Sequence, residues 1–283
     1  MSFIGKILQI KSIKVSLCFI EHLIKSINVS SWTYIEKKVY NPYDFWTDNI
    51  KYTKELYSNI IKKCDNFNFK LKDKNLLELW PGGFLWVWAF LKKEWIKNYF
   101  VIDDINHFEK LDNKTIDLYN NIDKTIIKWK SFDFNYIKQL SYNKKGLPLD
   151  NNSIDIIFSN AVYEHIDNPE ESIKELSRIT IKWWIWIHAI DYRDHIFNQK
   201  SLFFLTISDF IFNTLFKKSW ARVNRKRHSD FINYFRKNSF EILEESNNKR
   251  YYTWEENKYK KITDVYNIND LLISDTTLIV RKI

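Results

Sequence analysis

The densest group of side chains able to do chemistry in this chain of 283 residues is the run 191–195, Asp-Tyr-Arg-Asp-His. Carboxylate and imidazole groups can accept a proton from a reacting hydroxyl, and a guanidinium can bind an anionic group through two parallel hydrogen bonds. We therefore expect Asp191 or His195 to act as a general base, and Arg193 to bind an anionic part of the substrate. The run predicts an acceptor-binding loop.

Two histidines outside this run each have two interpretations. His188 lies on the apolar segment that leads into the run, and His165 follows another apolar segment at 154–159. In the functional interpretation His165 is a third catalytic candidate and His188 a second substrate-binding residue. In the other, His165 caps or packs its helix and His188 is buried within its strand.

Alternation of short apolar runs with helical patterns predicts the elements that position these residues. The runs that read as strands are 75–79, 98–103, 136–141, 154–159, 185–191, 240–245 and 276–281. The alternation predicts an α/β fold, a Rossmann-like doubly wound sheet of seven mostly parallel strands with its ligand at their carboxyl ends. We expect an N-terminal helical extension over 1–65 and one domain over 66–283. Within it, the inserted segment 201–228 is either a substrate lid or a packed helix with a solvated basic tail.

The turn after the first predicted strand carries the most specific motif. Residues 78–91 read ELWPGGFLWVWAFL, which becomes ELGPGGFLGVGAFL when tryptophan is replaced by glycine. In that form it resembles motif I of the class I S-adenosylmethionine-dependent methyltransferases. Asp103, the segment LPLDNNSIDIIFSNAVYEH at 147–165 and the segment ELSRITIKWWI at 175–185 resemble further motifs of this family in the same order. The branch most similar is methyltransferase type 11.

The resemblance implies a cofactor, a reaction and a set of cofactor-binding residues. The cofactor is S-adenosylmethionine, whose methyl group passes to an acceptor by in-line displacement. Asp103 stands where the family binds the ribose hydroxyls, and Asn143 stands where it usually has an acidic residue for the adenine amino group. The expected cofactor-binding residues are Glu78, Trp80, Gly82, Gly83, Asp103, Asn143 and Asn160. We expect a small-molecule, sugar or lipid-linked acceptor.

Three other functions compete with this one. The net charge of +9 admits a nucleic-acid methyltransferase, but residues 159–162 read SNAV where such amino-methylating enzymes typically have Asn/Asp-Pro-Pro-aromatic. The segment 147–165 also disfavours an oxidoreductase that uses a nicotinamide cofactor. A non-catalytic Rossmann-like protein with a lost cofactor site stays open, because an indole at position 80 or 86 would enter that site.

Cysteine usage and the N-terminal stretch bear on location and metal content. Cys18 and Cys64 share no metal-ligand spacing, so we expect no metal and no disulfide framework, which fits a reducing cytoplasm. Residues 1–28 alternate apolar side chains with lysine, which predicts an amphipathic helix. It packs on the domain or makes a peripheral membrane contact. The oligomeric state stays open.

Glycine and tryptophan occur in unusual numbers. The chain has 4 glycines and 12 tryptophans, whereas an average glycine content of about 7% would give roughly 20 glycines. The tryptophans at family glycine positions are Trp80, Trp86, Trp88, Trp183 and Trp184. Our hypothesis is that UGA codons of the gene mean glycine, and it predicts that indoles crowd the cofactor turn of the chain as written.

Overall fold

The computed structural model describes residues 50–82, 85–103, 113–128, 131–132, 137–141, 146–196, 202–216, 222–249 and 260–283. Of the N-terminal extension expected over 1–65, residues 1–49 lie outside this described part, and the rest belongs to helix α4 (Ile50–Asn66). Gly83 and Asn143, two of the expected cofactor-binding residues, also lie outside it.

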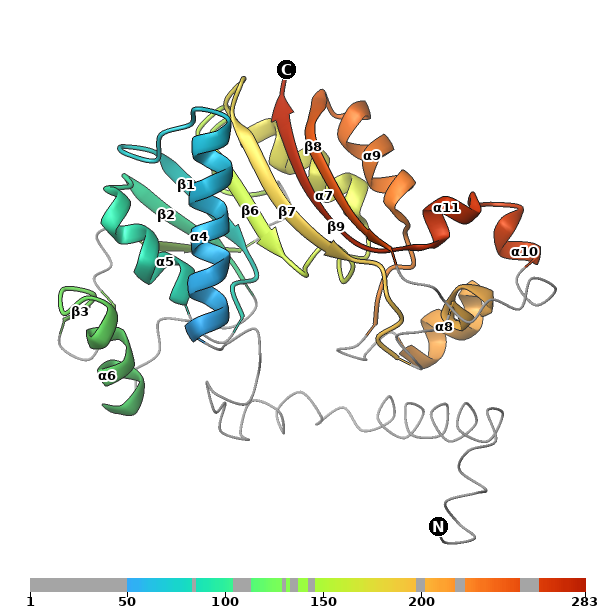
Figure 1. Cartoon of the computed structure of the whole chain (residues 1–283), viewed down its shortest axis with the longest axis horizontal. Helices are drawn as coiled ribbons and strands as arrows, with labels where there is room; N and C mark the ends of the chain where they lie inside the picture. Colours follow the sequence, from blue (N-terminus) through green and yellow to red (C-terminus); the bar gives the residue numbers. More distant parts are fainter. Residues whose placement is uncertain are drawn as a thin grey trace, which may run out of the picture.

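A seven-stranded sheet forms the centre of the fold (Figure 1). Its order is β5 (Ile137–Leu140), β2 (Asn98–Ile102), β1 (Asn75–Leu79), β6 (Ile156–Asn160), β7 (Ile185–Asp191), β9 (Ile273–Lys282) and β8 (Phe240–Lys249). The first five strands are parallel to one another, and β9 is antiparallel to both of its neighbours. The predicted α/β fold with a mostly parallel, Rossmann-like sheet of seven strands is confirmed.

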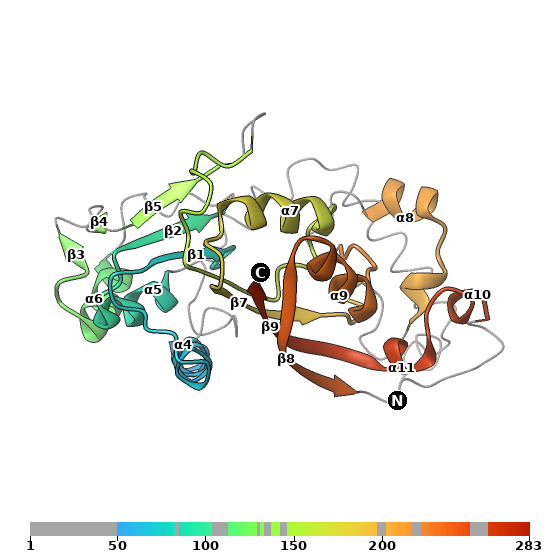
Figure 2. The same ribbon diagram turned by 90° about the horizontal axis from the view of Figure 1, so that it is seen from above.

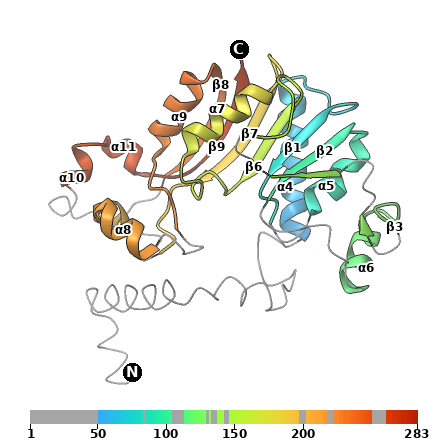
Figure 3. The same cartoon turned by 180° about the vertical axis from the view of Figure 1, so that it is seen from behind.

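Helices cover both faces of this sheet (Figures 2 and 3). On one face lie α7 (Pro169–Ile179) and α9 (His228–Lys237), which bury apolar side chains against the strands. On the other lie α4 and α5 (Trp86–Leu91). The remaining elements are α6 (Asn113–Ile122), a small hairpin of β3 (Ile127–Lys128) and β4 (Ser131–Phe132), α8 (Asp209–Phe216), α10 (Lys260–Thr263), α11 (Ile268–Leu271) and two short 3₁₀ helices at Lys92–Glu94 and Phe203–Thr206.

Helix α7 shows why the sequence folds this way locally. Pro169 opens it, where a missing N–H costs no intrahelical hydrogen bond, and acidic side chains follow in the first turn, beside the positive end of the helix dipole. Ile173, Leu176 and Ile179 recur at helical spacing and are buried. The helix therefore packs one apolar face on the sheet and brings β6 and β7 into adjacent, parallel positions.

The segment after β7 builds a separate apolar cluster. Phe204, Phe212 and Phe216 of this segment pack with Ile262 and Leu271, near the edge where β6 and β7 end (Figure 1). The described part of the predicted insertion at 201–228 is therefore folded next to the carboxyl ends of the strands. None of the described helices combines the length and hydropathy needed to cross a membrane.

Candidate active site

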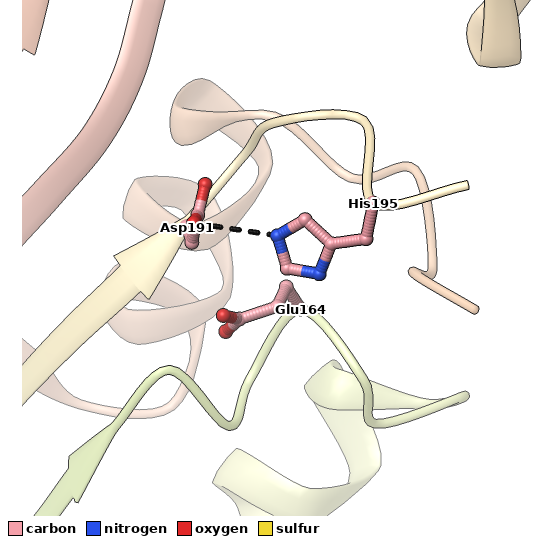
Figure 4. A group of neighbouring side chains, drawn as sticks. All are labelled: Glu164, Asp191 and His195. Atoms are coloured by element: carbon pink, nitrogen blue, oxygen red, sulfur yellow. Dashed lines mark ion pairs between the residues drawn. The ribbon is translucent and has the colours of Figure 1, made fainter. Parts of the chain in front are cut away.

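The ends of β6 and β7 bring several of the expected catalytic residues together. Asp191 is the last residue of β7, and His195 lies on the loop that follows. The His195 Nε2 atom is 3.3 Å from the Asp191 Oδ2 atom (Figure 4). The ring of His165, on the loop after β6, has its centroid 5.2 Å from that of His195. Two strands thus deliver three predicted catalytic side chains to one place.

Arg193 bonds to Asp191. The backbone N–H of Arg193 donates to Asp191 Oδ1 at 2.9 Å, and its Nε donates to both carboxylate oxygens at 2.7 and 2.8 Å. Burial opposes ionisation of Asp191, but hydrogen bonds from His195 and Arg193 outweigh it and hold the pKa of this carboxyl below its usual value. Asp191 is therefore a carboxylate at neutral pH.

Sequence reasoning did not single out Glu164, although it completes the same cluster. Its side chain is 2% exposed, and neither carboxyl oxygen has a hydrogen-bond partner. Burial raises its pKa well above the usual value, and the nearby amides of Glu164 and Asp191 offset only part of that effect. The only feature of the sequence that pointed to Glu164 was its position directly before His165, in the segment 147–165 that resembles a methyltransferase motif.

His165 is fixed by the polypeptide around it. Its Nδ1 donates to the carbonyl oxygen of Arg222 at 2.8 Å. Burial lowers the pKa of His165, so the neutral imidazole is favoured. With its Nδ1 carrying the proton, Nε2 keeps a lone pair.

His188 is not part of this cluster. Its side chain is fully buried in β7, with Nδ1 2.8 Å from Ser159 Oγ. The ring stacks on Phe235 with a centroid distance of 5.8 Å and meets the Tyr163 ring edge-on at 4.8 Å. The structure thus places His188 in the core, as the packing interpretation describes.

Burial of His188 predicts an acid-sensitive fold. Desolvation lowers its pKa from 6.5 to about 3, so the stability that the neutral ring contributes is present above pH 6.5 and is lost as the pH falls toward 3. At pH 4.5 we expect a loss of about 3 kcal/mol from this group. The H188N variant, whose amide can still bond Ser159, should lose less stability between pH 6.5 and 4.5 in urea unfolding. Equal losses in both proteins would show that His188 does not cause the fall in stability at acidic pH.

The turn after β1 is the expected cofactor-binding turn. Gly82 has φ +86°, a left-handed conformation in which glycine is unstrained, and Trp80 has φ +47° with 38% of its surface exposed. Glu78 is buried and accepts a hydrogen bond from the Tyr99 hydroxyl. Burial outweighs that bond and raises the pKa of Glu78 to about 8. The indole of Trp80 thus lies at this turn.

The other strand ends carry the remaining expected cofactor-binding residues. Asp103 follows β2, and its carbonyl oxygen accepts a hydrogen bond from Gln139 at 3.2 Å. Asn160 ends β6, and its side-chain amide donates to the Tyr52 hydroxyl of α4 at 2.8 Å. Glu78, Asp103 and Asn160 therefore end, or nearly end, three neighbouring parallel strands at one edge of the sheet.

The described tryptophans fall into two structural groups. Trp80, Trp95 and Trp183 have positive φ of +47°, +56° and +72°, and they are 38%, 76% and 60% exposed. Both described glycines also have positive φ. By contrast, Trp86 and Trp88 are buried in α5, so their indoles fill the core rather than crowd the turn. The backbone therefore favours glycine at three tryptophan positions.

Comparisons with known proteins give one family match. The family model described as "Methyltransferase domain" matches residues 113–182, from α6 to the turn before β7. A search of curated proteins finds no match.

Solved structures with similar folds share little sequence with this chain. A methyltransferase from Mesorhizobium loti that depends on S-adenosylmethionine is 10% identical, with 78% of this chain and 96% of that chain covered and a TM-score of 0.46. A candidate sarcosine dimethylglycine methyltransferase from Galdieria sulphuraria is 10% identical, with coverages of 81% and 85% and a TM-score of 0.49. A candidate methyltransferase in complex with the Trm112 activator, from Haloferax volcanii, is 12% identical, with coverages of 86% and 99% and a TM-score of 0.46.

The family match includes two of the segments on which the sequence resemblance was based, 147–165 and most of 175–185. The seven-stranded, mostly parallel sheet is the fold that the resemblance implies. Residues 113–182 are therefore similar to the methyltransferase domain, as the motifs in this part of the chain predict.

Proposed function

We propose that this enzyme transfers the methyl group of S-adenosylmethionine to a hydroxyl of a small-molecule, sugar or lipid-linked acceptor. The observation that carries the proposal is the cluster of Asp191, His195 and His165 beside the expected cofactor edge of the sheet. The acceptor oxygen forms a bond to the methyl carbon as the carbon–sulfur bond breaks. Sulfur keeps that electron pair, and the hydroxyl proton leaves through the polar cluster.

Residues at the strand ends fit the cofactor in part. Asp103 follows β2 with its side chain partly exposed, which suits the ribose hydroxyls, and the left-handed Gly82 allows close approach of the backbone. Trp80 places an indole where the backbone would have to approach the ligand. The turn fits the cofactor when residue 80 has no side chain. When bound, S-adenosylmethionine supplies a methyl group on a positively charged sulfur.

At the acceptor end, Asp191, His195 and His165 are the proposed catalytic residues. Arg193 holds the Asp191 carboxylate, and its positive charge favours an acceptor with an anionic group. The main contribution of such a loop to an in-line displacement is to position the acceptor and exclude water. His188, buried behind this loop, is a packing residue in this proposal.

Exposed apolar side chains on α8 support an acceptor with a lipid part. Phe210 is 80% exposed and Ile211 44% exposed, on a helix close to the end of β7 (Figure 1). Side chains of this kind can enter the surface of a lipid layer. The insertion would then present a lipid-linked acceptor to the cluster, in the role of a lid.

Measurement of turnover and cofactor binding in the same variants tests this proposal. In a chain with glycine at residue 80, D191N and H195A should each lower methyl transfer from labelled S-adenosylmethionine by a factor of about 100 or more, with unchanged cofactor affinity by calorimetry. The E241Q variant, with a change on the edge strand β8, is the control and should keep full turnover. Full turnover in both D191N and H195A would show that the acceptor binds elsewhere.

Trp80 favours a second candidate function, a non-catalytic protein that has lost its cofactor site. The indole lies at the turn whose backbone would have to contact the cofactor. A protein with glycine restored at residue 80 separates the two functions. Absence of cofactor binding in that protein would support the non-catalytic alternative.

A further inference from the structure

We propose that Glu164, Asp191 and His195 bind a divalent metal ion beside the acceptor. Each of the three offers one ligand atom, and these atoms lie within 4.8 Å of one another (Figure 4). They come from the ends of two adjacent parallel strands, β6 and β7. The expectation of no metal, drawn from the cysteine spacing, did not consider carboxylate and imidazole ligands.

The unpartnered Glu164 carboxyl is the first observation in favour of an ion. Its side chain is 2% exposed and both oxygens lack a hydrogen-bond partner. Buried carboxylates in proteins are normally paired with a cation or coordinate a metal. Arg193, whose charge also acts on Glu164, pairs with Asp191 rather than with Glu164 in the described part of the chain. A cation bound between Glu164 and Asp191 would meet this need.

The distance between His195 and Asp191 is the second observation in favour of an ion. At 3.3 Å, the Nε2 to Oδ2 separation is longer than the usual 2.9–3.0 Å of an N–H···O hydrogen bond, so this hydrogen bond is a long one. Two adjacent ligands on a six-coordinate ion with bonds of about 2.1–2.2 Å lie about 3 Å apart. The pair is therefore spaced as two ligands on one ion would be, after a small adjustment.

The surrounding residues hold the proposed ligands in place. The carboxylate of Asp191 accepts hydrogen bonds from Arg193, in the manner of an outer-shell partner of a ligating carboxylate. The backbone N–H of Asn224 donates to the Glu164 carbonyl at 2.6 Å. Asn224 Nδ2 also donates to the carbonyls of Tyr163 and Ile166 at 2.7 and 2.8 Å. The loop with Glu164 is thus clamped from the end of the insertion.

The ligand set indicates the class of ion. Carboxylate oxygens suit Mg²⁺ and Mn²⁺, and an imidazole nitrogen shifts the preference toward first-row transition ions. Mn²⁺ accepts both ligand types and is the probe of choice. Three protein ligands leave positions for an acceptor oxygen, whose pKa the ion would lower. In this arrangement Asp191 and His195 are ligands rather than the general base expected from the sequence, and this role of the ion rests on the proposed function.

Mn²⁺ binding to the chelator-treated full chain tests the site. The loss of the electron paramagnetic resonance signal of free Mn²⁺ should correspond to one bound ion per chain. E164Q should weaken Mn²⁺ binding at least tenfold. E245Q is the matched control, because Glu245 also faces a histidine, His228 at 2.9 Å, but lies outside the cluster. It should bind Mn²⁺ as the unaltered chain does. Melting temperatures of the three proteins without metal show whether each is folded.

Two results would overturn the metal site: no Mn²⁺ bound at millimolar concentration, or equal affinity in E164Q. Cofactor binding measured on the same samples keeps the two proposals separate. S-adenosylmethionine binding without Mn²⁺ binding would reject the metal site and leave the proposed function. Mn²⁺ binding in a glycine-restored chain that binds no S-adenosylmethionine would support the metal site and contradict the proposed function.

Discussion

Replacement of Trp80, Trp95 and Trp183 by glycine is expected to raise the free energy of unfolding by about 3 kcal/mol and to tighten S-adenosylmethionine binding at least tenfold. All three residues have positive φ, where a side chain costs about 1 kcal/mol per residue. Trp95 and Trp183 are largely exposed and Trp80 is 38% exposed, so burial of the three side chains offsets little of this cost. The gain in affinity comes from residue 80 alone, where loss of the indole opens the turn after β1.

Denaturant unfolding and calorimetry check this prediction. Trp184→Gly is the matched control, because this neighbouring tryptophan is not at positive φ and contacts the Phe69 ring at 5.3 Å and Lys74 Nζ at 4.3 Å. It should lower the stability. If the triple glycine variant were less stable than the unaltered chain, tryptophan would be the residue that the backbone accommodates. UGG codons at positions 80, 86, 183 and 184 would exclude the hypothesis that UGA codons of this gene mean glycine.

The second large effect is expected at Arg227, the residue before α9. Its guanidinium is fully buried and donates to the carbonyl oxygens of Tyr192, Leu271 and Ile273 at 2.6, 3.0 and 2.7 Å. It thereby joins the end of β7, next to Asp191, to the start of β9. R227M would leave these carbonyls without donors and should lower the free energy of unfolding by about 3–5 kcal/mol.

Urea unfolding of R227M beside R281M measures the effect. Arg281 forms an ion pair with Glu241 at 2.5 Å, with both side chains more than one-third exposed, so R281M should cost less than about 1 kcal/mol. Where R227M still folds, its turnover should also fall, because Tyr192 and the proposed catalytic loop lose a hydrogen-bond donor that holds them in place. A cost no larger than that of R281M would mean that the carbonyls find other donors.

The sequence was sufficient to predict most of the sheet and the place of the 191–195 loop at the carboxyl edge of the sheet. Apolar runs such as 75–79 and 154–159 predict strands because parallel strands are buried on both faces. The same runs predict that Glu78 and Asp103 lie at or near the ends of two strands. The run 191–195 predicted the cluster because a polar segment directly after a buried strand must lie at the carboxyl edge of the sheet.

The same burial hides what the sequence could not predict. In a strand buried on both faces, no alternation of polar and apolar residues shows which way a side chain points, so His188 could not be assigned to the core. Glu164 was missed for a related reason. Acidic residues are rarely buried without a partner, and its burial results from the later insertion and from β7, far away in the sequence.

The left-handed turn at residue 80 has a consequence for production of the protein from its own gene. If codon 80 is UGA, a host with the standard genetic code ends translation there or earlier. The product is then at most 79 residues long and ends with β1, one strand of a seven-stranded sheet. Such a fragment has no neighbouring strand to pair with and cannot fold. Full-length protein would require a host that reads the codon as an amino acid, or a recoded gene.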